Sequence, residues 1–225
     1  MPDAPKPEGP IAPAKTNETV PEIEQVKGAT IVSSDGSSVT DNRYENPYFG
    51  FTFDFPRDWH VLNNAAAKKV LEENGRKMAA GNPALEAEAK KPDVSTPLLA
   101  VSEPTPYKNS PVGRTFKILA SDVSAEKQPV TAEAYANALA SMAKEGKMPF
   151  ELLSGPERVT INGNKMAKLY LKLVFEGTTY YAVMWAVPKN QYMLQFMATS
   201  PEKDGLTDLE PVMQSLHFRA TATHP

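Results

Sequence analysis

Asp58 and His60 are the residues whose types and spacing could do chemistry most directly. A carboxylate and an imidazole two positions apart point to the same side of a β-strand, where they could bind a metal ion or move a proton. Protein metal sites commonly take about three or more protein ligands, and the neighbouring sequence supplies no third one. A simpler interpretation is that Arg57 and Asp58 form a turn and that Asp54 lies on the solvent face of a strand. We therefore predict no catalytic or metal site, with Asp58 and His60 as the only metal candidates.

The rest of the chain carries no recognised catalytic motif. It contains no cysteine, which removes disulfides, thiolate metal sites and cysteine nucleophiles. No GxSxG elbow, P-loop, GxGxxG or HExxH pattern occurs. The adjacent carboxylates Glu72 and Glu73 would point apart on a helix. The sequence therefore predicts a protein that is not an enzyme and has no cofactor, and a hydrolase using scattered carboxylates ranks last among the alternatives.

Tyr180, Trp185 and Tyr192 form a candidate binding surface on two neighbouring predicted strands. Tyr and Trp side chains on adjacent strands could floor a groove for a peptide or an apolar ligand. Packing of the same rings in the core beneath a helix is the simpler explanation, because central strands bury such residues routinely.

The charge and hydropathy of the chain exclude two kinds of partner. Its formal net charge is −3, and its densest basic pairs, Lys68-Lys69 and Lys90-Lys91, fall in helix-like stretches. A nucleic-acid surface needs clustered Lys and Arg, so we expect no nucleic acid as a partner. No apolar run reaches the roughly 18 residues that a membrane span requires.

The first strand expected near Asp58 and His60 is marked by alternating phenylalanines between Phe49 and Phe55. A period of two predicts a strand with one buried face, and Pro56 ends it because it cannot donate to the sheet. A short edge strand is expected before it at Thr30–Val32. Residues 65–91 are rich in Ala, Lys and Glu, which predicts a helical insertion at one edge of the sheet.

The second half of the chain combines one clear helix with a meander of strands. The helix is expected from Thr131, as its cap, to Lys147, with Gly146 as terminator. The dipeptide Asn162-Gly163 predicts a tight hairpin, and the strand at residues 179–187 is apolar on both faces, which is typical of a central strand. A final helix over residues 206–216 would end beside His217. The helix expected between Thr131 and Lys147 has a predicted apolar stripe of Tyr135, Leu139 and Met142.

These elements predict an α+β domain with a mainly antiparallel sheet sandwiched between helices. The expected organisation is a Pro-rich disordered leader at 1–28, a single domain at 29–220 and a frayed tail at 221–225. The leader contains six prolines and hardly any large apolar side chain, so it cannot bury enough surface to offset its ordering entropy.

Two stretches, "YFGFTFDFPRDW" and "QYMLQFMATSPEKDGLTDLEPVMQSLHF", resemble the PsbP-like family. This family includes the photosystem II extrinsic protein PsbP, the Ran-binding Mog protein and exported bacterial proteins and lipoproteins. The resemblance covers about residues 44–218 and implies an α/β/α sandwich in which Pro56 and Trp59 form a structural corner. The matching residues are Gly50, Phe51, Pro56, Trp59, Tyr192, Phe196, Ser215 and Phe218.

Members of that family act as assembly factors, binding partners or adaptors, so the resemblance implies a non-catalytic interaction or assembly module with an unknown protein partner. Bacterial members carry a similar Pro-rich tether after a signal or lipid anchor. This favours a periplasmic or extracellular, membrane-tethered location with an anchor upstream of Met1. A native start at Met1 would favour the cytoplasm. The alternative function is a carrier of a small apolar ligand or peptide, with residues 65–91 as a lid over a cleft.

Overall fold

The computed structural model describes residues 23–24, 30–32, 36–62, 64–89, 95–104, 106–108, 113–175 and 177–219. Most of the expected leader and the whole of the expected tail lie outside these residues. No helix in the described ranges is long and apolar enough to cross a membrane.

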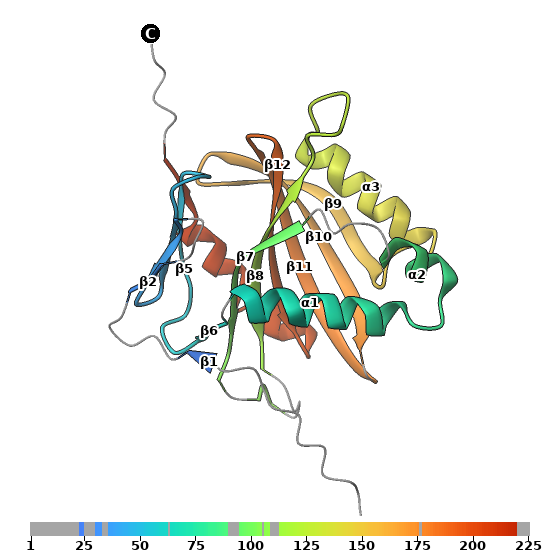
Figure 1. Ribbon diagram of the computed structural model, residues 1–225, viewed down its shortest axis with the longest axis horizontal. Helices are drawn as coiled ribbons and strands as arrows, with labels where there is room; N and C mark the ends of the chain where they lie inside the picture. The colour runs from blue at the N-terminus through green and yellow to red at the C-terminus, as the bar shows by residue number, and fades with distance from the viewer. Residues whose placement is uncertain are drawn as a thin grey trace, which may run out of the picture.

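The centre of the molecule is an antiparallel sheet of eight strands (Figure 1). Its strands follow the spatial order β1, β6, β7, β8, β12, β11, β10 and β9. Their bounds, in that order, are Ile23–Glu24, His60–Leu62, Ser95–Ser102, Thr115–Asp122, Tyr192–Ser200, Thr178–Lys189, Asn164–Phe175 and Glu151–Ile161.

A second antiparallel sheet of five strands packs against one face of the large sheet. Rings from one of its inner strands, Phe51–Asp54, reach across the interface, where Phe53 stacks on Phe116 at 4.7 Å and Phe51 contacts Phe196 at 5.7 Å. The predicted alternation is therefore confirmed, because these rings are fully buried while the residues between them are half-exposed. In spatial order the strands are β13 (His217–Phe218), β5 (Phe51–Asp54), β4 (Arg43–Asn46), β3 (Ser38–Thr40) and β2 (Thr30–Val32).

Three α-helices lie on the other side of the large sheet: α1 (Asn64–Ala79), α2 (Pro83–Ala89) and α3 (Ala132–Lys144) (Figure 1). The expected cap of α3 is present, because Thr131 Oγ1 accepts a hydrogen bond from Ala134 N at 3.1 Å. The predicted apolar stripe of Tyr135, Leu139 and Met142 is only half-buried, with Leu139 packed against the core, and the fully buried residues of α3 are Ala132, Ala136 and Ala140. These small side chains let the helix backbone approach β9, β10 and β11 closely, and the larger residues sit at the flanks.

The late hairpins agree with the sequence pattern. Asn162 and Gly163 both have positive φ (47° and 79°), as a type I′ turn requires. Strand β11 lies between β10 and β12, and apolar residues cover both of its faces. The α+β class with a mainly antiparallel sheet is thereby confirmed.

The expected final helix is instead two 3₁₀ helices, η1 (Lys203–Leu206) and η2 (Glu210–Ser215). Hydrogen bonds in this region join residues three apart, as from Leu209 N to Leu206 O and from Val212 N to Leu209 O. Short 3₁₀ turns are favoured here because Pro211 lacks the N–H that an α-helix would use. His217 consequently lies in β13, opposite Thr52, and not at a helix end.

Candidate functional site

The structure separates the residues that sequence reasoning had considered for metal binding. Asp58 lies exposed in a turn, whereas His60 is half-buried as the first residue of β6, opposite Ser102 of β7. The carboxylate of Asp54 is paired with Arg43, whose guanidinium donates two hydrogen bonds to it at 2.6 and 2.8 Å. Within the described part of the chain, no three His, Cys, Asp or Glu side chains come together as a metal site would require.

The aromatic candidates do not form one surface. Trp185 is 2% exposed and lies with Tyr192 on the face that packs against the small sheet. Tyr180 lies opposite Leu173 in the β10–β11 register, and Leu173 packs beneath α3 on the other face. Tyr192 is partly buried by edge-to-face contacts with Tyr48 and Phe49.

Charged groups gather near Trp59 as well, but they satisfy one another. Arg114 makes two side-chain hydrogen bonds to Glu103, at 2.8 and 3.1 Å, and a third to Asp208 at 3.1 Å. Its guanidinium also lies 4.5 Å from the ring centre of Tyr107 and 6.0 Å from that of Trp59. This arrangement fixes the corner between β7, β8 and η1.

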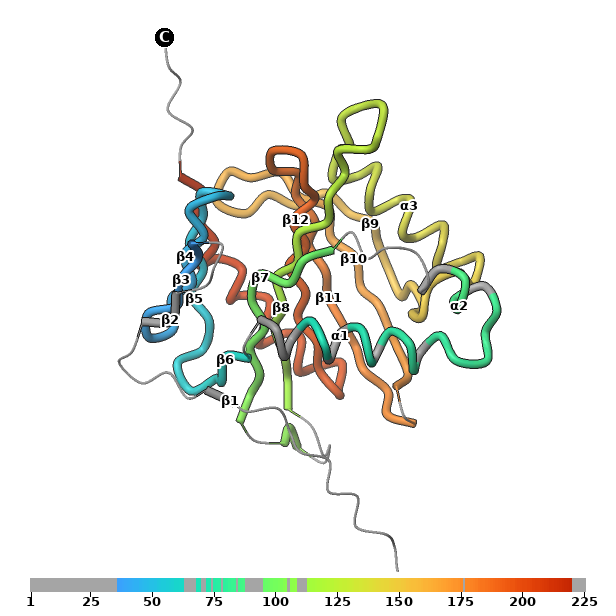
Figure 2. Tube along the Cα trace, viewed as in Figure 1, coloured from blue at the N-terminus to red at the C-terminus, as the bar shows by residue number. Residues whose placement is uncertain are grey.

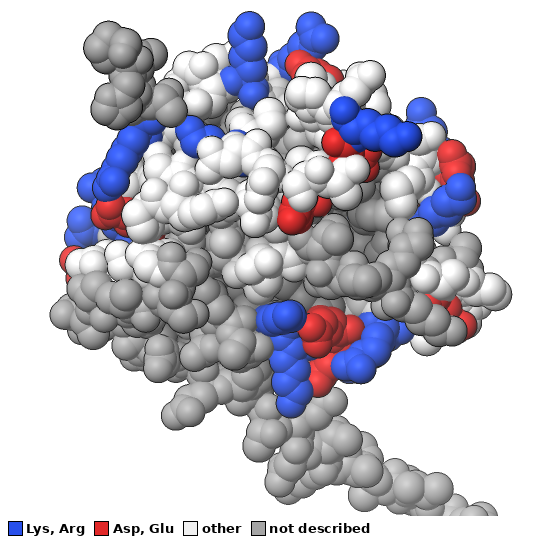
Figure 3. All heavy atoms as spheres, turned by 45° about the horizontal axis from the view of Figure 1, so that its top comes forward, with Lys and Arg blue, Asp and Glu red and all other residues white. Residues whose placement is uncertain are grey.

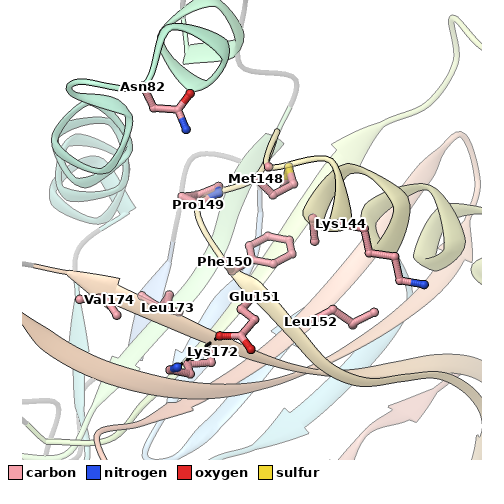
Figure 4. Close-up of a pocket in the computed structure, with 12 residues that line it drawn as sticks. Asn82, Lys144, Met148, Pro149, Phe150, Glu151, Leu152, Lys172, Leu173 and Val174 are labelled. Atoms are coloured by element: carbon pink, nitrogen blue, oxygen red, sulfur yellow. Dashed lines mark hydrogen bonds and ion pairs between the residues drawn. The ribbon is translucent and has the colours of Figure 1, made fainter.

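An open groove lies where α3 ends and the chain enters β9 (Figure 4). The chain leaves α3 through Gly146, whose positive φ of 69° permits the sharp turn. Figure 2 shows α2 lying next to this end of α3, so the α1–α2 turn at Asn82 closes one side of the groove. Its volume is about 490 Å³, and it is lined by Asn82, Ala143, Lys144, Gly146, Met148, Pro149, Phe150, Glu151, Leu152, Lys172, Leu173 and Val174.

The walls of this groove are mainly apolar and partly open to solvent. The ring of Phe150 lies in its middle, between Met148 and Leu152 (Figure 4). Val174 on its rim is 57% exposed, and Leu153 nearby on β9 is 39% exposed. These two are among the few large apolar side chains that the described residues leave exposed, so the corner is set apart from the rest of the surface.

The groove runs beside β9, which is the last strand of the large sheet. Among the described residues, the outer edge of β9 has no strand partner. Its second half is protected in the usual ways, because Pro156 offers no N–H and Arg158 forms an ion pair with Glu133 of α3 at 3.0 Å. The first half of β9, residues 151–154, carries no proline and no ion pair to a helix, although its pairing with β10 shifts register at Leu153 and Glu151 adds a charge.

Basic groups slightly outnumber acidic ones around the groove. Lys172 and Glu151 form an ion pair at 3.2 Å across the β9–β10 register, and Lys144 adds a further positive charge. On the face shown in Figure 3, Lys and Arg are interspersed with Asp and Glu and do not gather into one field. The electrostatic character of the site is therefore local and weakly positive.

Sequence reasoning had not identified this site. One signal was present: Val174 falls on the same side of β10 as Lys168, Tyr170 and Lys172, where a polar residue would be expected. The other walls depend on how residues from three separate parts of the chain meet, which no local pattern reveals.

No known protein-family model matches the chain, and no curated protein is similar to it in sequence. Among solved structures, the chain is similar to the solution structure of cyanobacterial PsbP (CyanoP) from Synechocystis sp. PCC 6803. The TM-score is 0.48 and the identity 13%, over 79% of this chain and 91% of the other. It is also similar to LpqN, described as involved in cell envelope biogenesis of Mycobacterium tuberculosis, with a TM-score of 0.41 and 13% identity over 83% and 85% of the two chains. The resemblance expected from the sequence is met at the level of the fold, which by itself says nothing of activity.

Proposed function

We propose that this protein is a non-catalytic interaction module that binds an extended segment of a partner protein along the first half of β9. The observation that carries the proposal is the exposure of Leu153 and Val174 beside an edge that no described strand covers. An extended peptide can add to such an edge through main-chain hydrogen bonds, while alternate side chains enter neighbouring pockets. The groove containing Phe150 provides a pocket of this kind.

The chemistry of the groove suggests the sequence of its occupant. An aliphatic side chain would cover Met148, Phe150 and Leu173, and an acidic neighbour would complement Lys144 and Lys172. The expected partner segment is therefore extended and alternates between aliphatic and acidic residues.

Titration with a synthetic peptide tests this proposal. A capped Glu-Val-Glu-Val-Glu-Val-Glu peptide is added to isotope-labelled protein, and backbone amide shifts are followed by NMR. We expect the shifts to concentrate at residues 151–154 and at Val174. A peptide of the same sequence with alternate backbone nitrogens methylated should not bind, because it cannot pair with the edge.

A pair of variants tests whether the peptide binds at the groove or along the second half of β9. Val174→Glu should weaken peptide binding about tenfold, because it places a charge at an exposed apolar wall. Thr160→Glu carries the same charge change in the second half of β9 and should leave binding unchanged. Shifts that map elsewhere, equal affinities for the two variants, or no binding of the peptide would refute the proposal.

We also propose that residues 1–28 act as a tether in an extracytoplasmic setting and that residues 29–220 form one domain. The support is compositional, since the six prolines of the leader favour an extended chain. Limited proteolysis should cut within residues 1–28 and 221–225 well before it cuts elsewhere. Early cleavage within residues 65–91 would contradict the single domain, and recovery of the native protein only from the cytoplasmic fraction would contradict the location.

A further inference from the structure

Strand β1 lies at the edge of the large sheet opposite to β9 (Figure 1). It consists of only Ile23 and Glu24, which pair with Leu62 and Val61 of β6. Two paired residues provide few main-chain hydrogen bonds, each of modest net strength, so this backbone pairing alone holds β1 weakly.

The sequence at β1 matches the occupant expected in the groove beside β9. Glu22, Ile23 and Glu24 place an aliphatic side chain between two acidic ones. The same arrangement of a Val, Ile or Leu between two acids occurs at one other place in the sequence, around Leu209. Leu209 is only 2% exposed in the core, so the triplet at β1 is the one that can act as a ligand.

We propose that residues 18–24, termed the donor segment, add as a strand to the first half of β9 in a second copy of this chain. This inference rests on the proposed function, since it takes the same edge and groove as the binding site and names a second copy as the partner. An added strand gains main-chain hydrogen bonds along the edge and inserts a side chain into the groove.

Side chains of the donor segment then meet suitable groups on both faces of the sheet. Leu173 packs beneath α3, so the apolar side of the groove is the helix-facing side, and Ile23 enters it there. Lys172 is next to Leu173 in β10 and therefore points to the opposite face, as Glu22 and Glu24 do beside Ile23.

Lys172 can receive an incoming acid. Its side chain is 36% exposed, although its amine already pairs with Glu151 at 3.2 Å. The amine has three donors, so it can bind a second carboxylate on its open side.

The backbone of the donor segment also suits an edge. In an extended strand the N–H groups of alternate residues point to the same side. When Glu22 and Glu24 donate to β9, Pro21, which has no N–H, faces away from it. The added strand therefore pairs on one side and blunts the new edge that it forms.

The donor has to come from another molecule. Seven strand spacings of about 4.8 Å separate the two edges of the eight-stranded sheet, which is about 34 Å along the sheet. Only five residues separate Glu24 from Thr30 of β2, a reach of about 20 Å, and β2 lies at the end of the molecule away from β9 (Figure 1). A copy that accepts a donor on β9 still presents its own donor at the far edge, so copies associate head to tail.

A capped peptide of residues 18–24, Glu-Thr-Val-Pro-Glu-Ile-Glu, tests the contact directly. It is titrated into the isotope-labelled Ile23→Asp variant of the full chain, whose β9 edge stays free of donors, and amide shifts are followed by NMR. We expect the shifts at residues 151–154 and at Val174. The same peptide carrying Ile23→Asp should bind at least about tenfold more weakly.

Self-association of the full chain tests the assembly. Sedimentation velocity of the wild type should show oligomers that grow between about 10 μM and 1 mM protein. Ile23→Asp removes the donor and Val174→Glu removes the acceptor, so each variant alone should be monomeric. An equimolar mixture restores one contact and should form dimers that do not grow further. Ile11→Asp makes the same change elsewhere among residues 1–28 and should associate like the wild type.

The outcomes separate this inference from the proposed function. A wild type that stays monomeric over this range, or Ile23→Asp protein that forms dimers by itself, would overturn the inference. If the Glu-Val repeat peptide shifts residues 151–154 and the peptide of residues 18–24 does not, the edge binds a different protein and only this inference fails. If neither peptide shifts these residues, the proposed function fails with it.

Discussion

The amine of Lys168 lies 2.5 Å from Oε2 of Glu210, and this ion pair ties η2 to β10 of the large sheet. The Lys168 side chain is only 11% exposed. Its amine also lies 5.8 Å from the ring centre of Trp185, and the hydroxyl of Tyr170 donates to the other carboxylate oxygen of Glu210 at 2.7 Å. A buried cation, a ring and a carboxylate are thereby fixed by one another.

Removing one member of this pair should be costly. Glu210→Ala is expected to lower the free energy of unfolding by about 2–3 kcal/mol, because Lys168 keeps its charge and loses its closest acceptor. The double variant Lys168→Met with Glu210→Leu should recover most of the loss, since neither charge remains. Urea unfolding measures both. The exposed pair Lys172–Glu151 is the control, and Glu151→Ala should cost no more than about 1 kcal/mol. Similar losses from Glu210→Ala and Glu151→Ala would contradict this account.

Ser215 should matter more than an ordinary half-buried serine. Its hydroxyl lies 3.0 Å from Asp54 N, 2.9 Å from Asp54 O and 2.7 Å from Val212 O, so it joins η2 to β5. Ser215→Ala is expected to cost about 1–2 kcal/mol in chemical unfolding, because a part-buried N–H loses its acceptor. Ser215→Thr, which keeps the hydroxyl, should cost less, and an equal loss would point to packing as the cause.

Alanine substitutions at two glycines are expected to change the stability of the protein in opposite directions. A Cβ on Gly205 would clash with Ser200 Oγ and lie 3.0 Å from Cε1 of Tyr107, so Gly205→Ala should lower the melting temperature by several degrees. A Cβ on Gly75, inside α1, would meet nothing within 4 Å. Gly75→Ala should therefore stabilise the protein by about 0.5–1 kcal/mol. Destabilisation by Gly75→Ala would show that α1 is packed differently from the structure.

Much of the fold could be predicted because its signals are local. The alternation from Phe49 to Phe55 and the Asn162-Gly163 turn specify strands and a hairpin within a few residues of sequence. The PsbP-like residues also have structural explanations: Phe218 packs on Phe51 at 5.5 Å, and Gly50 O accepts a hydrogen bond from Arg219 N at 2.7 Å.

The site residues could not be predicted because their roles depend on distant parts of the chain. The alternation in "RTFKILASDV" does not show which side of this strand faces helices, because the helices of residues 64–79 and 132–144 come from distant parts of the chain. The alanine face of α3 was missed for a related reason: the rule that large apolar residues face the core fails where a helix approaches a sheet closely. The groove depends on Asn82, Phe150 and Val174 meeting in space.

The ion pair at the Trp59 corner predicts a defined loss of stability in acid. Burial tends to raise the pKa of Glu103, but hydrogen bonds and charge from Arg114 outweigh this effect and leave the pKa below its ordinary value of 4.5. A lowered carboxyl pKa means that the stabilisation is complete above 4.5 and is lost as the pH falls through the folded-state pKa. The difference in unfolding free energy between wild type and Glu103→Gln should therefore be constant near neutral pH and shrink below about pH 4.5. A difference independent of pH would exclude the ionised pair as its source.

Lys117→Met should make the protein more stable, which is unusual for a substitution in the layer between sheet and helices. The Lys117 amine is desolvated without a described partner, so its charged form carries a cost that Met, of similar length, does not. At neutral pH we expect a gain of about 1 kcal/mol in urea unfolding, and the control Lys165→Met should stay within about 0.5 kcal/mol of wild type. The folded-state pKa of Lys117 is lowered from 10.5, so above that pKa the folded protein gives up a proton that the unfolded chain still holds. The stability of wild type should consequently rise toward that of Lys117→Met as the pH approaches about 10. A gain that does not narrow with pH would mean that improved packing, and not relief of a desolvated charge, explains it, and a loss of stability would show that the amine has a partner in the folded protein.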